Sequence, residues 1–117
     1  MKVLFVQKVP MLAAALTLTL LKQGYEVVFC KEASEVVTMI KDIQPQLIIA
    51  DITFSKNGGQ LISIAKHKRI PVIVLSEMAN ENVLQQAFDL GADDYASLPV
   101  SLTELSLRIN KVTRFRA

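Results

Sequence analysis

Short apolar runs alternate with longer segments of helical period along the whole chain. Three of the runs are continuous and rich in β-branched residues, which is typical of strands covered by helices on both faces of a parallel sheet. Five strands are therefore predicted, at residues 3–6, 27–29, 47–50, 72–75 and, more weakly, 94–96.

The segments between the strands predict five helices. They lie at about residues 12–22, 33–43 and 59–68, after Asn80, and after Ser101. Gly24 and Gly91 stand where helices stop, Pro45 ends the second helix, and Ser34, Asn80 and Ser101 are candidate N-caps. The apolar positions expected to face the core are Leu12, Ala15, Leu16, Leu20, Val36, Val37, Ile40, Ile43, Leu61, Ile62, Ile64, Ala65, Val83, Leu84, Ala87, Phe88, Leu102, Leu105, Ile109 and Val112, with Thr19 on the same face.

Strict alternation of strands and helices predicts an α/β domain with right-handed crossovers and a doubly wound parallel sheet. In such sheets the functional residues lie beyond the carboxyl ends of the strands. The question of function therefore reduces to the residues that follow each strand.

Composition supports one cytoplasmic domain. The 117 residues are 51% hydrophobic, which suits a single core, and the net charge of +2 is too balanced for a typical nucleic-acid binder. The single cysteine, Cys30, forms no internal disulfide, fits a reducing cytosol and is read as ordinary packing. Gln7, Lys8 and Pro10 interrupt the apolar start, which argues against a secretory signal or a membrane span.

The most informative strand end is Asp51. A carboxylate that follows a buried strand is suited to accept a phosphoryl group or bind a cation, and the alternative is that it caps local backbone N–H groups. Gln7 and Lys8 follow the first strand, Ser76 follows the fourth, and Leu98 follows the fifth.

Several motifs together resemble the receiver domain of bacterial response regulators. They are Pro10, Gly24-Tyr25-Glu26-Val27, Pro45-Gln46-Leu47-Ile48-Ile49-Ala50-Asp51, Gly59, Pro71-Val72-Ile73-Val74-Leu75-Ser76 and the segment from Ala87 to Tyr95. The resemblance implies a flavodoxin-like (βα)5 three-layer sandwich with a parallel sheet of order 2-1-3-4-5. It also implies a two-component signalling module over residues 1–113, with 114–117 as a tail or linker, and not an enzyme.

The resemblance assigns roles to positions of this chain. Asp51 matches the phosphoacceptor, and Ser76 and Tyr95 match the two switch residues. The acidic pair that holds Mg²⁺ in the family is replaced by Gln7 and Lys8, and the family's lysine before the proline is Leu98. Ser55 stands where the family has a loop proline. Loss of Mg²⁺ binding is therefore expected, with no other cofactor.

Two functions remain open from the sequence. One is an atypical receiver-like domain that acts by protein–protein interaction without Mg²⁺-dependent phosphorylation. The other is a phosphoacceptor whose Asp51 is phosphorylated by a histidine kinase through an altered site. An ion pair between Lys8 and Asp51 and a solvent-exposed Lys8 are alternatives as well. An independent α/β enzyme lacks support, because no phosphate-binding glycine loop follows the first strand.

The first helix carries a second apolar strip, Met11, Ala14, Leu18 and Leu21, directed away from the core stripe. It predicts a homodimer or another protein contact, unless the fifth helix covers it. A protein partner or sensor kinase is expected, whereas nucleic acid would be bound only through an effector domain outside this chain. The basic residues 66–69 are read as a solvated helix end.

Overall fold

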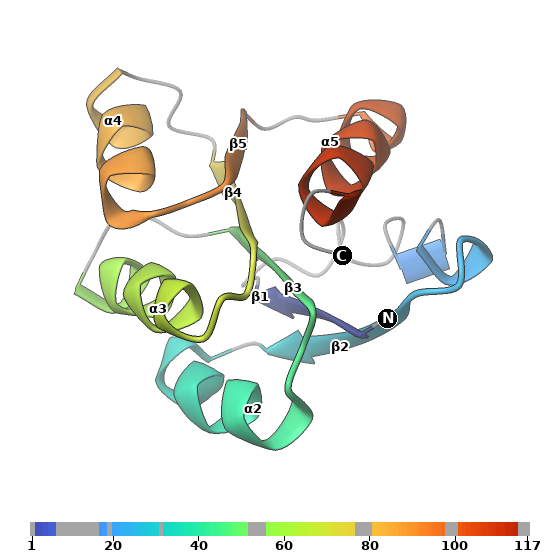
Figure 1. The fold of residues 1–117 in the computed structure, drawn as a ribbon, viewed down its shortest axis with the longest axis horizontal. Coiled ribbons are helices and arrows are strands. Elements are labelled where there is room, and N and C mark those ends of the chain that lie inside the picture. Colours follow the sequence, from blue (N-terminus) through green and yellow to red (C-terminus); the bar gives the residue numbers. More distant parts are fainter. Residues whose placement is uncertain are drawn as a thin grey trace.

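The protein folds as a five-stranded parallel sheet between two layers of helices (Figure 1). This computed structural model describes residues 2–6, 17–18, 20–30, 32–51, 56–76, 81–97 and 101–114. The strand order is β2-β1-β3-β4-β5, which confirms the predicted order 2-1-3-4-5. The strands are β1 (Lys2–Val6), β2 (Glu26–Cys30), β3 (Leu47–Asp51), β4 (Val72–Ser76) and β5 (Asp94–Ser97).

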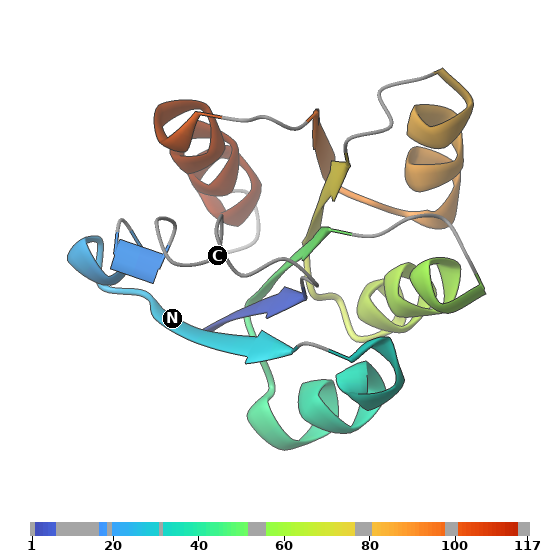
Figure 2. The same ribbon diagram turned by 180° about the vertical axis from the view of Figure 1, so that it is seen from behind.

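Helices cover both faces of the sheet, as Figures 1 and 2 show from opposite sides. One face carries the 3-10 turn η1 (Ala33–Glu35) and the helices α2 (Val36–Ile43), α3 (Lys56–His67) and α4 (Glu81–Leu90). The other face carries α5 (Leu102–Arg114) and a helical segment at residues 17–18 and 20–22, here called the first helical segment.

The core consists of two apolar clusters, one on each face of the sheet. Because side chains alternate along a strand, Leu4 and Ile48 belong to the cluster with α2, α3 and α4, whereas Phe5 and Ile49 belong to the cluster with α5. All four are completely buried. Burial on both faces is the reason that these strands are continuous apolar runs.

Glycines end two of the helices as predicted. Gly24 has φ +88° and Gly91 has φ +110°, a backbone region that L side chains rarely adopt. After Gly91, the Ala92 N–H donates to the Ala87 carbonyl at 3.0 Å, which satisfies a carbonyl left open at the end of α4. At Gly91 an added Cβ would also lie 2.5 Å from the Cδ of Lys66 on α3.

The structure corrects three local predictions. Ser34 is not the cap of the second helix, because a 3-10 turn precedes α2 and Glu35 occupies the N-cap without a side-chain hydrogen bond. Val37 and Phe88 are not inward, since each is 44% exposed. Each directly follows a buried residue, Val36 or Ala87. Successive side chains of a helix point in directions about 100° apart, so the residue after a buried one is turned towards the surface.

Helix α3 also begins at Lys56, three residues before the predicted start at 59. The other inward positions with described side chains are buried or half-buried. The predicted cap Asn80 and the predicted inward residues Leu12, Ala15, Leu16 and Thr19 lie outside the described residues, as do the side chains of Val83, Leu84 and Leu102.

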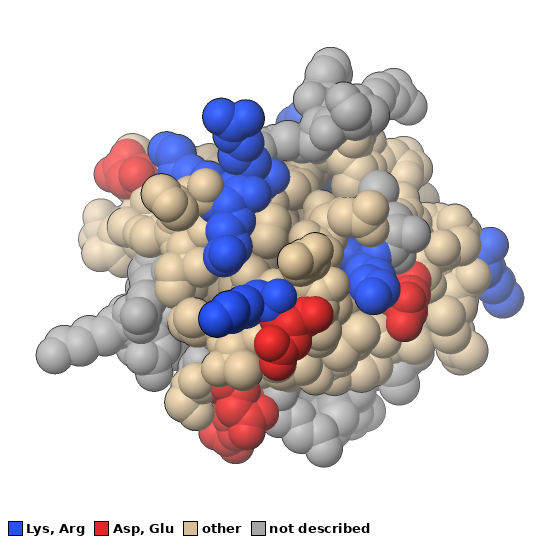
Figure 3. Space-filling view, turned by 60° about the horizontal axis from the view of Figure 1, so that its bottom comes forward, with Lys and Arg blue, Asp and Glu red and all other residues tan. Residues whose placement is uncertain are grey.

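Figure 3 shows Lys and Arg side chains together with Asp and Glu side chains on one face of the molecule. This mixture agrees with the small net charge of the chain, +2. Within the described part of the chain, no helix has the length and apolar character needed to cross a membrane.

Candidate functional site

Two of the predicted site residues lie on neighbouring strands at the carboxyl edge of the sheet. Asp51 is the last residue of β3 and is paired in register with Leu75 of β4. Ser76 follows Leu75 directly and ends β4. The backbone therefore brings Asp51 and Ser76 to the same edge, as expected for a parallel sheet.

The central strand β3 also lies beside β1, in which Val6 is paired with Ala50. The carboxyl end of β1 therefore lies next to the carboxyl end of β3. Gln7, Lys8 and Leu98 lie outside the described residues, so the structure does not test an ion pair between Lys8 and Asp51.

Tyr95 is buried, with 8% of its surface exposed. It lies on β5 opposite Val74 of β4, and its side chain belongs to the apolar cluster with α2, α3 and α4. The residue at the predicted aromatic switch position therefore has its ring packed against the domain rather than directed into solvent.

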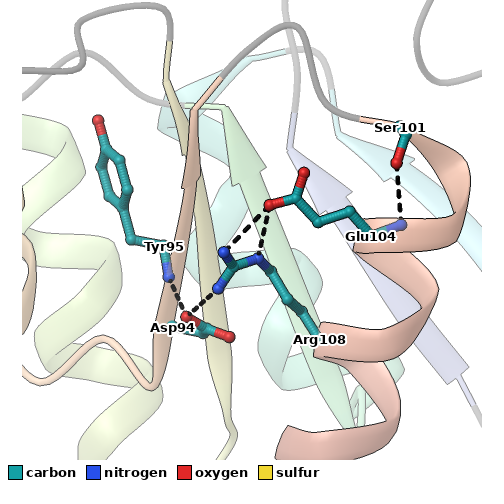
Figure 4. A network of polar contacts seen from close by, with 5 residues as sticks. All are labelled: Asp94, Tyr95, Ser101, Glu104 and Arg108. Atoms are coloured by element: carbon teal, nitrogen blue, oxygen red, sulfur yellow. Dashed lines mark hydrogen bonds and ion pairs between the residues drawn. The ribbon is translucent and has the colours of Figure 1, made fainter.

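A polar network beside Tyr95 was not predicted from the sequence (Figure 4). Asp94, the first residue of β5, is 6% exposed, and its Oδ1 accepts a hydrogen bond from the backbone N–H of Tyr95 at 2.8 Å. Nη1 of Arg108 on α5 donates to the same oxygen, also at 2.8 Å. Glu104 lies one turn before Arg108 and accepts from its Nε and Nη2 at 3.3 and 3.1 Å.

The sequence holds only part of the signal for this network. The spacing of Glu104 and Arg108 is that of an i,i+4 ion pair, which can be read without a structure. The contact of Arg108 with Asp94 spans 14 residues and depends on how α5 packs against β5. Burial disfavours the charged guanidinium, but the hydrogen bonds from Arg108 to Glu104 and Asp94 outweigh it and raise the pKa of Arg108.

The side chain of Asp93, just before β5, forms a hydrogen bond with the start of the neighbouring strand β4. Oδ2 of Asp93 accepts the backbone N–H of Val72 at 2.9 Å, and the Asp93 N–H donates to the Val72 carbonyl at 2.9 Å. Asp93 and Asp94 therefore both make polar contacts that hold the start of β5 in place. The described residues contain no group of three His, Cys, Asp or Glu side chains that could hold a metal ion.

The fold and the site define the class of protein. A parallel sheet of order 2-1-3-4-5 brings an aspartate and a serine to adjacent strand ends and has a buried tyrosine on its edge strand. This is the arrangement that the motifs in the sequence predicted for a receiver domain. The match of residues 3–110 to the family model of the response regulator receiver domain shows that the chain belongs to this family.

Relatives from bacteria agree with this assignment. Over 116 residues the chain is 33% identical to "Response regulator RR06" of Streptococcus pneumoniae serotype 2, with 97% of this chain and 54% of the relative covered. Over 115 residues it is 32% identical to "Transcriptional regulatory protein KdpE" of Staphylococcus aureus, covering 97% of this chain and 50% of that protein. The chain thus spans about half the length of these relatives.

Solved structures have the same fold. A response regulator from Desulfuromonas acetoxidans aligns with a TM-score of 0.86 and 29% identity over 97% of both chains. The BeF3-activated N-terminal receiver domain of Klebsiella pneumoniae RstA aligns with a TM-score of 0.87, covering 97% of this chain and 99% of that one. The second pair is 22% identical and speaks for the fold alone.

Proposed function

We propose that this chain is an atypical receiver domain that signals through protein–protein contact, without Mg²⁺-dependent phosphorylation. The observation that carries the proposal is the pair Gln7 and Lys8 at the positions where the family has two acidic residues. The family's lysine is also replaced, by Leu98. Receiver domains interact with sensor kinases and effector domains and are generally not enzymes, so a protein partner is the expected ligand.

Electrostatics explain why these replacements matter. Mg²⁺ is usually held by one or two carboxylates together with other oxygens and water, and among these positions only Asp51 supplies a carboxylate. Two unit charges 4 Å apart repel each other by about 4 kcal/mol at an effective dielectric constant of about 20, and a divalent ion doubles this value. An ammonium group at residue 8 therefore opposes metal binding. The donor set of this chain does not fit Mg²⁺.

Phosphoryl transfer depends mainly on positioning and on neutralising the charge of the transferred group. Without the metal and without a lysine at position 98, Asp51 would accept a phosphoryl group with little electrostatic help. Of the two alternatives for Lys8, an ion pair with Asp51 would put a fixed charge in the place of the metal and would hold the domain in one state.

The alternative is a phosphoacceptor that works through an altered site. It is favoured by the retention of Asp51, Ser76 and Tyr95, and by the placement of Asp51 and Ser76 on adjacent strand ends. In this case the positive charge that Mg²⁺ and the lysine supply in the family would come from a histidine kinase or from another cation.

Incubation with a small-molecule phosphodonor, with and without Mg²⁺, separates the two functions. We expect no phosphate adduct by intact mass for the native chain. The double variant Gln7→Asp/Lys8→Asp should gain Mg²⁺-dependent phosphorylation, because it restores the two acidic residues. Asp51→Asn in either background is the control. A Mg²⁺-dependent adduct on the native chain that disappears with Asp51→Asn would overturn the proposal and favour the alternative.

The proposed partner surface is the apolar strip of the first helix. Leu18 is 65% exposed and Leu21 is 53% exposed, whereas Leu20 between them is completely buried. Met11 and Ala14, the other members of the strip, lie outside the described residues. Two large exposed apolar side chains one helical turn apart support a homodimer or another protein contact here. A cytoplasmic location, and nucleic-acid binding only through an effector domain, are part of the same proposal.

A further inference from the structure

The carboxylate of Asp94 is buried and incompletely paired. Its Oδ1 accepts two hydrogen bonds, from the Tyr95 N–H and from Arg108, but its Oδ2 has no hydrogen-bond partner in the part of the chain that the structure describes. A buried charge is stable only when it is paired, and removing its partner leaves an uncompensated charge. Within the described residues, Arg108 supplies the one positive charge paired with Asp94.

The guanidinium of Arg108 pairs with two carboxylates, those of Asp94 and Glu104, which differ in solvent exposure. The side chain of Asp94 is 8% exposed, whereas that of Glu104 is 48% exposed. Water screens the outer pair, so the contact with Glu104 is the weaker of the two. If Glu104 releases the guanidinium, the planar fork can present two N–H groups to Asp94, and Oδ2 then gains a donor.

The same carboxylate reaches the backbone of Tyr95. Consecutive residues of a strand point to opposite faces, so Asp94 and Arg108 lie on the α5 side of β5 while the Tyr95 ring lies on the other side (Figure 4). The hydrogen bond from the Tyr95 N–H to Asp94 therefore connects α5 on one face of the sheet with an aromatic side chain packed on the other.

We propose that Arg108 is a positioning residue for Tyr95: by holding the Asp94 carboxylate, it fixes the start of β5 and with it the buried orientation of the Tyr95 ring. The switch role of Tyr95 belongs to the proposed function, and the inference rests on that function in this respect alone.

Two measurements on Tyr95 test the positioning role. The chain has two tyrosines and no tryptophan, so Tyr25→Phe leaves Tyr95 as the single fluorescent phenol. In this background Arg108→Gln should increase acrylamide quenching of Tyr95 at least about twofold and speed hydrogen exchange of the Tyr95 amide about tenfold, because the Asp94 carboxylate turns towards water. Amides of the central strand β3 should keep their exchange rates, which a general loss of stability would not permit.

Matched variants make the test specific. Lys111→Gln removes an exposed cation of the same helix, and it should leave Tyr95 unchanged. Arg108→Lys should restore part of the protection, because one ammonium can reach Asp94 but cannot bridge to Glu104. Glu104→Gln should leave quenching equal or lower, because the guanidinium is then free to pair with both oxygens of Asp94.

If Arg108→Gln does not fold, the double variant Asp94→Asn/Arg108→Gln removes the buried charge and should fold. We then expect Tyr95 quenching above that of the Tyr25→Phe parent. Equal quenching and exchange in the folded Arg108 variant and in Lys111→Gln, or a double variant with the quenching of the parent, would overturn the inference. None of these measurements uses a phosphodonor or Asp51, so a failure here is distinct from a failure of the proposed function.

Discussion

Cys30 shows how packing changes the acidity of a single thiol. It ends β2, is 1% exposed, and its thiol donates to the carbonyl of Glu32 at 3.1 Å. Burial raises the pKa of this thiol above its ordinary value of 9.0, and the negative charges of Glu35 and Glu32 act in the same direction. The thiolate, which is the reactive form, is therefore disfavoured in the folded protein.

The raised pKa of Cys30 predicts a loss of stability at alkaline pH. The folded state holds the thiol proton more tightly than the unfolded state, so this contribution is fully present below the unfolded pKa and falls as pH rises from 9.0 towards the folded pKa. Urea midpoints measured from about pH 8 to about pH 10 should fall more steeply for the native chain than for Cys30→Ala. Parallel curves would show that Cys30 does not titrate differently on folding.

At the scale of the element, each helix depends on how its ends are satisfied. Ser101 caps α5, because its Oγ accepts the backbone N–H of Glu104 at 3.0 Å. The backbone at the ends of α2 and α3 is in a less favourable conformation. Gln44 has φ 53° and Arg69 has φ 60°, at positions where a glycine would adopt a positive φ more easily. These helices therefore end in the left-handed conformation with some strain.

Removal of the Ser101 cap should destabilise the domain. We expect Ser101→Ala to lower the free energy of unfolding by about 1 kcal/mol, since one backbone N–H at the start of α5 loses its acceptor. Urea denaturation followed by circular dichroism gives the value. Thr103→Ala is the matched control, because Thr103 is exposed in the same turn and alanine favours helix at least as well. Equal losses in both variants would contradict the capping role.

The helices also show which signals can be read from sequence alone. Gly24, Gly91 and Ser101 were predicted correctly, because each meets a local requirement of the backbone at a helix end. Val37 and Phe88 were wrongly assigned to the inward face of their helices. Each is an apolar residue next to the inward stripe, and the spacing of apolar residues alone does not separate such a neighbour from a member of the stripe. The contact between Arg108 and Asp94 could not be predicted, because it depends on the packing of two elements.

For the whole molecule, the alternation of apolar runs and helical segments was sufficient to predict the sheet and its crossovers. The strand order that the resemblance to receiver domains implied is confirmed as well. The continuous apolar runs of β1 and β3 fit strands that helices cover on both faces. The site is known less completely. The sequence identified Asp51, Ser76 and Tyr95, and the structure describes the backbone of the first two and the burial of the third.

The exposed leucines of the first helical segment predict self-association at this scale. Sedimentation velocity over increasing concentration should show a dimer for the native chain, whereas Leu18→Gln/Leu21→Gln should remain monomeric, because both side chains are more than half exposed and contribute little to the core. Leu107→Gln is the control, since Leu107 is an equally exposed leucine on α5. A native chain that stays monomeric, or a dimer that survives the double variant, would argue against this surface.

The strand order has a consequence for synthesis of the chain on the ribosome. β1 is made first, yet it lies inside the sheet between β2 and β3. Its residues Val3, Leu4 and Phe5 are completely buried in the finished domain, but they have no partner until residues 26–30 and 47–51 have left the exit tunnel. The nascent chain therefore exposes an apolar segment during this interval, which makes early binding by a chaperone advantageous.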